Sequence, residues 1–228
     1  MKKTFLLLIV VTSAIMAGAQ VKEGTLIYES LTDIRSKVPE AMRAMMPAAI
    51  KMKAQLAFKD SIALYTSLPN DDNDNNSPGL MITRPPSVIF SDLANGIVTE
   101  QTEMGGTTYR IIDTLYRLHW RLVDSVKTIV GFSCKKATIS LKDGRFVQAW
   151  YTENIPLPGG PVQFGNLPGM ILAADDGEVA LTAIRFVASV DKDQIKKPLK
   201  GKLINRKDYV EKAHNEMGSG VKTMFFNN

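Results

Sequence analysis

Methionine is the residue type whose spacing most suggests chemistry in this sequence. Met42, Met45 and Met46 stand at positions i, i+3 and i+4, which lie on one face of a helix. Thioether sulfurs are soft ligands that suit Cu(I). The same spacing is typical of an apolar helix stripe, and flexible methionines also form adaptable surfaces for apolar ligands. The segment therefore has three interpretations: packing, an apolar binding surface, and Cu(I) handling.

Residues for other metal sites and for catalysis are few. The two histidines, His119 and His214, fall in different predicted elements, so a zinc site of the usual kind lacks ligands. In the acidic loop 69–79, a calcium-binding count that starts at Asp72 has Ser77 where glycine is needed and Thr83 where glutamate is needed. The sequence also lacks a nucleophile elbow, a P-loop and an H-E-x-x-H motif. We expect no metal site, no cofactor and no enzymatic activity.

The N-terminus has the pattern of a secretory signal peptide. Lys2 and Lys3 precede a short apolar run, and small residues at 17–19 form a cleavage site. We expect residues 1–19 to be this signal and residues 20–228 to form a single domain that is exported to the periplasm or cell envelope. No later stretch is apolar enough to span a membrane, so we expect no transmembrane segment in the mature chain.

Charge and cysteine content limit the partners and the bonding. The formal net charge of +5 is too mild to favour nucleic acid, and the basic excess gathers near the C-terminus. That excess predicts either a solvated tail or a contact with an acidic partner or anionic lipid. Cys134 is the only cysteine, which excludes an internal disulfide. Because Cys134 falls in a strand pattern, we expect a buried thiol, with a reactive thiol as the alternative.

Short strands separated by turns make up most of the chain. The strands 54–58 and 62–67 predict one hairpin, and Asn95-Gly96 marks the turn of another. Asp143-Gly144 predicts a two-residue turn, which would pair Ala137 with Trp150. Such hairpins favour an antiparallel sheet that curves into a half-barrel.

Two helices are expected beside this sheet. The first spans Ser36–Ala54 and contains the methionine stripe, with Pro47 as a break or kink. The second has Asn205 as its N-cap and ends at Gly218. The fold class is therefore α+β, with a methionine-rich helical segment against a curved antiparallel sheet and a helix at the C-terminus.

Turn residues are concentrated between residues 155 and 169, before a strand that is expected to start near Met170. The segment reads IPLPGGPVQFGNLPG, and it predicts a rigid crossover without helical structure. One interpretation is that it covers an exposed sheet edge. The other is that it forms the lip of an apolar cavity, with Trp150, Tyr151 and Phe164 near the mouth.

Residues 149–172 resemble the signature of the GLPGLI family of exported proteins. The hexad Asn166–Ile171 stands where that family has Gly-Leu-Pro-Gly-Leu-Ile, with Asn and Met as the departures. Further positions resemble the family pattern: Trp120, Lys127, Ile129, Gly131, Cys134, Lys136, Ala137, Trp150, Tyr151, Thr152, Ile155 and Pro156. The family is described as of unknown function, and its genes are said to lie near outer-membrane transport genes. The resemblance thus implies a role in the cell envelope.

These observations lead to one hypothesis of function and two alternatives. We expect a non-catalytic envelope protein that binds an apolar ligand, a lipid or lipopeptide, in the concave sheet. The alternatives are an interaction module for an outer-membrane protein of the transport or assembly machinery, and a Cu(I)-handling protein. The expected ligand-binding residues are Trp150, Tyr151, Phe164, Leu167, Met42, Met45 and Met46.

Overall fold

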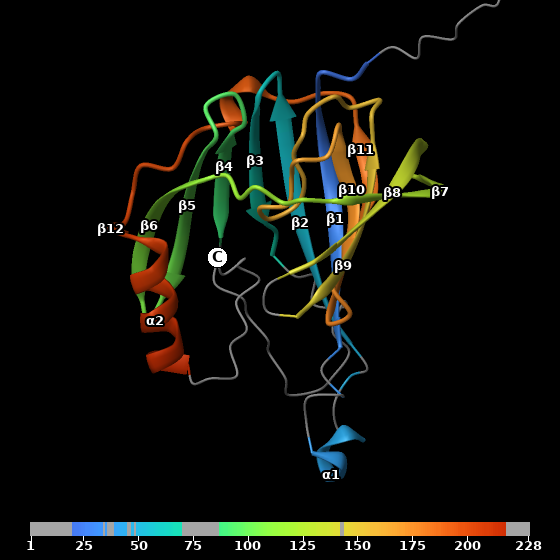
Figure 1. Ribbon diagram of the computed structural model, residues 1–228. Coiled ribbons are helices and arrows are strands. Elements are labelled where there is room, and N and C mark those ends of the chain that lie inside the picture. Colours follow the sequence, from blue (N-terminus) through green and yellow to red (C-terminus); the bar gives the residue numbers. More distant parts are fainter. Residues whose placement is uncertain are drawn as a thin grey trace, which may run out of the picture.

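Twelve β-strands join into one sheet in the part of the chain that the computed structural model describes, residues 20–33, 35, 39–44, 47, 49–69, 87–141 and 144–217 (Figure 1). The strands are β1 (Glu23–Asp33), β2 (Ala49–Lys59), β3 (Ile62–Ser67), β4 (Val88–Asp92), β5 (Ile97–Met104), β6 (Thr107–Thr114), β7 (Arg121–Ile129), β8 (Phe132–Ser140), β9 (Phe146–Thr152), β10 (Met170–Asp175), β11 (Val179–Val187) and β12 (Lys202–Ile204). The helices are α1 (Glu40–Arg43), the 3₁₀ helix η2 (Lys192–Gln194) and α2 (Arg206–Met217). The predicted signal peptide lies outside the described residues.

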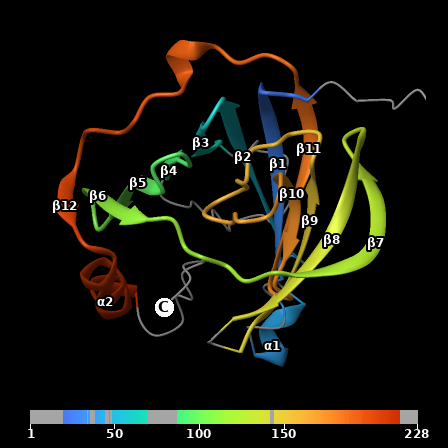
Figure 2. The ribbon, with the colours of Figure 1, turned by 45° about the horizontal axis from the view of Figure 1, so that its top comes forward.

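The sheet is curved but does not close into a barrel. Its strand order is β12-β6-β5-β4-β3-β2-β1-β11-β10-β9-β8-β7, so β12 and β7 are its two edges. All neighbouring pairs are antiparallel except β12 and β6, which are parallel. Figure 2 shows the strands around an open ring, with the connection 115–120 running across the open side from β6 to β7. The prediction of a mostly antiparallel, curved sheet is therefore confirmed.

Alternating apolar side chains hold the centre of the sheet together. In β1 every second residue from Gly24 to Ser30 is buried, as a strand with one core face requires. Leu26 and Tyr28 are fully buried in the largest apolar cluster, which also contains Leu56 and Phe58 of β2. The Tyr28 hydroxyl donates a hydrogen bond of 2.6 Å to the carbonyl oxygen of Ile171, so this phenol is satisfied inside the core.

The turn signals predicted the hairpins well, with one error of register. β2 and β3 are joined at Asp60 and Ser61, and β4 and β5 at the turn that contains Gly96. Between β8 and β9, however, Ser140 pairs with Phe146 and Ala137 pairs with Ala149. The predicted two-residue turn at Asp143-Gly144 is therefore wrong, because the loop is three residues longer and closes with a hydrogen bond from Leu141 N to Arg145 O.

The predicted methionine-rich helix Ser36–Ala54 is wrong as a continuous helix. Among the described residues of this segment only Glu40–Arg43 is helical, and residues from Ala49 onward belong to β2, which pairs with β1 along its whole length. Ile50, Ala54 and Leu56 are buried at even spacing, so the period of a strand prevails here over the helical stripe. Met42 lies in α1, and Met45 and Met46 lie outside the described residues.

The C-terminal helix α2 is confirmed together with its cap. The backbone N–H of Asp208 donates a hydrogen bond of 2.8 Å to Asn205 Oδ1. In return, the side-chain Nδ2 of Asn205 donates one of 2.7 Å to the Asp208 carboxylate. Tyr209 and Ala213 are buried against Met104, Tyr109 and Ile111 of the sheet. Among the described residues no helix is long and apolar enough to cross a membrane.

The crossover between β9 and β10 lies inside the curve of the sheet (Figure 2), and β10 begins at Met170 as predicted. Asn166 has a φ of 66°, so it occupies the left-handed region that asparagine tolerates. Its side-chain oxygen accepts a hydrogen bond of 3.0 Å from Leu118 N, and Trp120 Nε1 donates one of 2.8 Å to Gly165 O. The connection 115–120 and the crossover therefore hold each other in place.

Gly169 fixes how closely the crossover approaches β9. A Cβ atom at this position would lie 2.0 Å from Thr152 O, whereas at Gly159 the nearest atom would be the flexible Leu93 Cδ1 at 3.2 Å. We predict that Gly169→Ala lowers the free energy of unfolding by about 3 kcal/mol and Gly159→Ala by about 1 kcal/mol or less. Urea unfolding of the two variants checks this, and equal losses would contradict the close approach.

Candidate functional site

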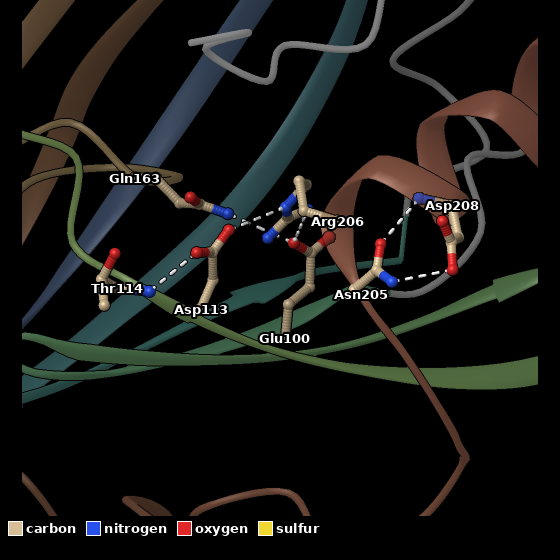
Figure 3. Close-up of polar contacts among 7 residues, drawn as sticks. All are labelled: Glu100, Asp113, Thr114, Gln163, Asn205, Arg206 and Asp208. Atoms are coloured by element: carbon tan, nitrogen blue, oxygen red, sulfur yellow. Dashed lines mark hydrogen bonds and ion pairs between the residues drawn. The ribbon is translucent and has the colours of Figure 1, made fainter.

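A cluster of charged and polar side chains lies where β5, β6, α2 and the crossover meet (Figure 3). At its centre Arg206 Nη1 donates a hydrogen bond of 2.7 Å to Glu100 Oε2. Arg206 Nε lies 3.5 Å from Asp113 Oδ2, so one guanidinium serves two carboxylates. We call Glu100, Asp113, Gln163 and Arg206 the polar cluster.

Local structure explains why these side chains converge. Glu100 stands on the face of β5 that also buries Val98, Thr102 and Met104, so it points inward. Asp113 comes from β6, the neighbouring strand, and accepts a hydrogen bond of 2.8 Å from Thr114 N. Arg206 is the first residue of α2, directly after the Asn205 cap, so the start of the helix fixes its position.

Gln163 brings the crossover into the cluster. Its Nε2 donates a hydrogen bond of 3.2 Å to Glu100 Oε2. Its Oε1 is buried and has no hydrogen-bond partner within the part of the chain that the structure describes. A buried amide oxygen without a partner is costly, so this atom is an acceptor available to a ligand or to water.

Exposure rises in steps from the interior outward. The Glu100 side chain is 2% exposed, Arg206 is 12% exposed and Asp113 is 25% exposed. Tyr116, in the connection that follows β6, is partly exposed and also interacts with Arg206. A molecule from solvent would therefore meet Asp113 and Tyr116 before it reached Glu100.

Electrostatics keep the guanidinium charged and the phenols neutral. Burial acts to lower the pKa of Arg206, but Glu100, Tyr116 and Asp113 oppose it, and the net shift of the pKa is upward. Burial raises the pKa of Tyr116 and of Tyr209, and the Tyr209 hydroxyl is hydrogen-bonded to Thr102. The cluster thus offers carboxylate and amide acceptors with guanidinium and phenol donors, a set that suits a polar ligand rich in hydroxyl or amide groups.

Sequence analysis missed this cluster, although one signal was present. Glu100 interrupts an inward row of apolar or small residues on β5, and a charge at such a position is rare without a partner. Its partner Arg206 lies 106 positions later in the chain, so no local pattern could connect the two.

The residues expected to bind an apolar ligand are only partly brought together. Tyr151 and Leu167 are buried in one apolar cluster, and Phe164 packs against it with Trp120, whose ring centroid lies 6.4 Å away. Trp150 lies on the opposite face of β9 and packs against the largest cluster instead. Met42 belongs to α1, and the binding role of the whole set stays a prediction.

Two kinds of metal ligand are considered for this chain, the side chains of His, Cys, Asp and Glu, and the methionine sulfurs. Within the described residues no group of three or more His, Cys, Asp and Glu side chains could hold a metal ion. Cu(I) handling by Met42, Met45 and Met46 is a different matter and stays a prediction, since this finding does not concern methionine. His119 and His214 are both exposed.

Cys134 is buried, as its strand position predicted. It belongs to the largest apolar cluster, so it packs there as a small hydrophobic residue. Burial raises its pKa to about 11, so the thiol is protonated at neutral pH.

We predict that Ellman's reagent at pH 8 modifies native Cys134 about 200-fold more slowly than in the urea-unfolded chain, because the thiolate fraction is smaller by about that factor. The pKa of Cys134 in the folded chain lies above the unfolded value of about 8.5. The contribution of the protonated thiol to the free energy of unfolding is therefore complete below pH 8.5 and is lost as the pH rises through about 11. Fast labelling of the native protein would contradict the buried position.

Comparison with known proteins shows similarity to an N-glycanase domain. Residues 100–210 match a family described as N-glycanase peptide, N-terminal domain. Two structures of PNGF-II, in space groups C2 and P21, have TM-scores of 0.58 and 0.56, with 14% identity over 83% of this chain. This chain covers 32% of those chains, about a third of their length.

Other comparisons add little. An uncharacterized conserved protein from Thermus thermophilus has a TM-score of 0.42 with 8% identity, over 82% of this chain and 91% of that one. No curated protein matches this sequence. The likeness to PNGF-II, at its low identity, concerns the fold.

Two expectations from the sequence are corrected by these matches. The resemblance of the Asn166–Ile171 hexad to the GLPGLI family is wrong, because the family that matches is the N-glycanase domain. The expectation of no enzymatic activity is also corrected, because the domain that this chain resembles is named after an enzyme, an N-glycanase. The resemblance carried by the hexad and by scattered positions between Trp120 and Pro156 was a weaker guide than the match over residues 100–210.

The ion pair at the centre of the cluster gives a direct test of its energetics. We predict that Arg206→Met lowers the free energy of unfolding by about 3–5 kcal/mol, because it leaves Glu100 buried without its guanidinium. The double variant Glu100→Gln with Arg206→Met should lose less, since neither charge then remains. Lys135→Met is the control: its pair with Glu153 is half exposed, so about 1 kcal/mol or less is expected in urea unfolding.

Proposed function

We propose that this chain recognises N-glycosylated peptides and takes part in N-glycanase-type chemistry, with the polar cluster as its ligand site. The observation that carries the proposal is the position of the cluster. Glu100, Asp113, Gln163 and Arg206 all fall within residues 100–210, the segment similar to the N-glycanase domain. Because the similarity covers only 32% of the PNGF-II chain, the proposal concerns recognition first.

The chemistry of the cluster supports a glycosylated ligand. Sugar hydroxyls both donate and accept hydrogen bonds, and the amide that links a glycan to asparagine has an N–H donor. Gln163 Oε1 is an acceptor without a partner among the described residues, and it lies beside a carboxylate and a guanidinium. Hydrogen bonds formed in such a buried setting are stronger than the same bonds in water.

The two carboxylates would have different roles. Asp113 is the one that a ligand can reach, since its side chain is 25% exposed, and Tyr116 stands near it. Glu100 is enclosed and acts through Arg206, whose guanidinium it holds in place at 2.7 Å. Asp113 would therefore contact the ligand, and Glu100 would be a positioning residue.

Other hypotheses from the sequence stay predictions. Export to the cell envelope depends on residues 1–19, which lie outside the described residues. Binding of a lipid or lipopeptide, and docking to an outer-membrane protein, are compatible with the proposal but have no contact here that supports them. Cu(I) handling depends on Met45 and Met46, which also lie outside the described residues.

Binding of a short peptide with an N-acetylglucosamine-bearing asparagine tests the proposal by calorimetry. Gln163→Met keeps the size of the side chain but removes the open acceptor, so we predict binding about fivefold to tenfold weaker, equivalent to about 1 kcal/mol. Lys135→Met is the control. Lys135 is exposed on β8 and is not part of the polar cluster, so this variant should bind like the parent. Failure of the parent to bind, or unchanged binding by Gln163→Met, would contradict the proposal.

A further inference from the structure

Two lysines converge on one indole ring at the end of the sheet away from the polar cluster. Lys127 Nζ lies 4.3 Å from the centroid of the Trp150 ring, and Lys136 Nζ lies 5.7 Å from it. The three residues come from the neighbouring strands β7, β8 and β9, and Trp150 is the direct pairing partner of Lys136. Figures 1 and 2 place these strands opposite β5, β6 and α2.

Strand pairing explains why both lysines lie on the same face of the sheet as Trp150. Lys127 pairs with Cys134, and Lys136 follows Cys134 by two residues, so all three side chains share one face. Lys135 between them points the other way and pairs with Glu153 at 2.8 Å. The arrangement is therefore set by the backbone register.

Within the part of the chain that the structure describes, neither Lys127 nor Lys136 forms an ion pair with a carboxylate. Asp175 acts on Lys127 only from beyond ion-pair distance. Burial lowers the pKa of Lys127, and the neighbouring charge of Lys136 acts in the same direction. Two like charges held over one ring repel each other, and a bound anion would relieve that repulsion.

We propose that Lys127, Lys136 and Trp150 form a binding site for an oxyanion of the sulfate or phosphate type. Each ammonium group has three N–H donors, and an oxyanion has several acceptor oxygens that can bridge two such groups. The indole face attracts both cations and holds them before the anion arrives, which reduces the entropy lost on binding. The anion is either free or carried as an ester on a sugar.

This site is independent of the function proposed above. It lies at the opposite end of the sheet from the polar cluster and uses none of its residues. Loss of glycopeptide binding in Gln163→Met would leave the oxyanion site unaffected, so failure of one proposal does not imply failure of the other.

Two-dimensional NMR of the full chain tests the proposal with an internal control. The chain has two tryptophans, so the spectrum has two indole N–H signals, which a Trp120→Phe spectrum assigns. We expect titration with sodium phosphate, at an ionic strength held constant with chloride, to shift the Trp150 signal to saturation while the Trp120 signal stays in place. N-acetylglucosamine 6-sulfate is the second probe, with N-acetylglucosamine as its uncharged control.

Three variants identify the residues responsible. Lys127→Gln and Lys136→Gln should each weaken phosphate binding about tenfold or more, whereas Lys135→Gln, on the other face, should bind like the parent. A sugar sulfate that binds more tightly than phosphate indicates an ester ligand, and equal affinities indicate a free anion. Parallel, unsaturated drift of both indole signals, or unchanged affinity in both Lys127→Gln and Lys136→Gln, would overturn the proposal.

Discussion

The buried ion pair between Glu100 and Arg206 is the interaction on which the arrangement of this end of the molecule depends. Both groups are removed from water, and that desolvation is offset only because the pair is close and has further hydrogen bonds. The pair fixes the first turn of α2 against β5, and through Gln163 it also fixes the crossover. The pair thereby joins the start of α2 to the crossover inside the curve of the sheet.

The polar cluster and the pair of lysines on Trp150 lie at different ends of the sheet. The polar cluster lies where the crossover meets β5, β6 and α2, while the paired lysines lie on β7 to β9. Between them the crossover and the connection 115–120 bind each other through Trp120 and Asn166. The joined crossover and connection 115–120 therefore lie between the polar cluster inside the curve and the two lysines on the strands at the other end.

The sequence predicted what depends on local pattern. The hairpin of strands 54–58 and 62–67 and the Asn205 cap both follow from side chains close in sequence, and both are confirmed. The prediction of a helix over Ser36–Ala54 was wrong because the apolar residues there fit both a helical and a strand period. Pairing with β1 places the residues from Ala49 onward in a strand. Asp143-Gly144 misled the β8–β9 register because the loop closes at Arg145, whose side chain is paired with Asp176 at 3.1 Å.

The candidate site lay beyond sequence reasoning for a physical reason. Its strongest contact joins residues 106 positions apart, and only the curvature of the sheet and the start of α2 bring them together. The inward position of Glu100 was the available sign, since a buried charge requires a partner. The hexad Asn166–Ile171 has a structural place instead: it forms the end of the crossover and the start of β10, with Leu167 buried.

Hydrogen exchange with mass spectrometry, with and without a glycosylated asparagine peptide, tests the central claim most directly. If the polar cluster is the ligand site, the peptide should slow exchange in segments 98–104, 111–116, 160–166 and 205–210 together, because these carry the residues around it. Segments 121–136 should exchange as before. Protection confined to β7 and β8, or no protection anywhere at a saturating peptide concentration, would contradict the account.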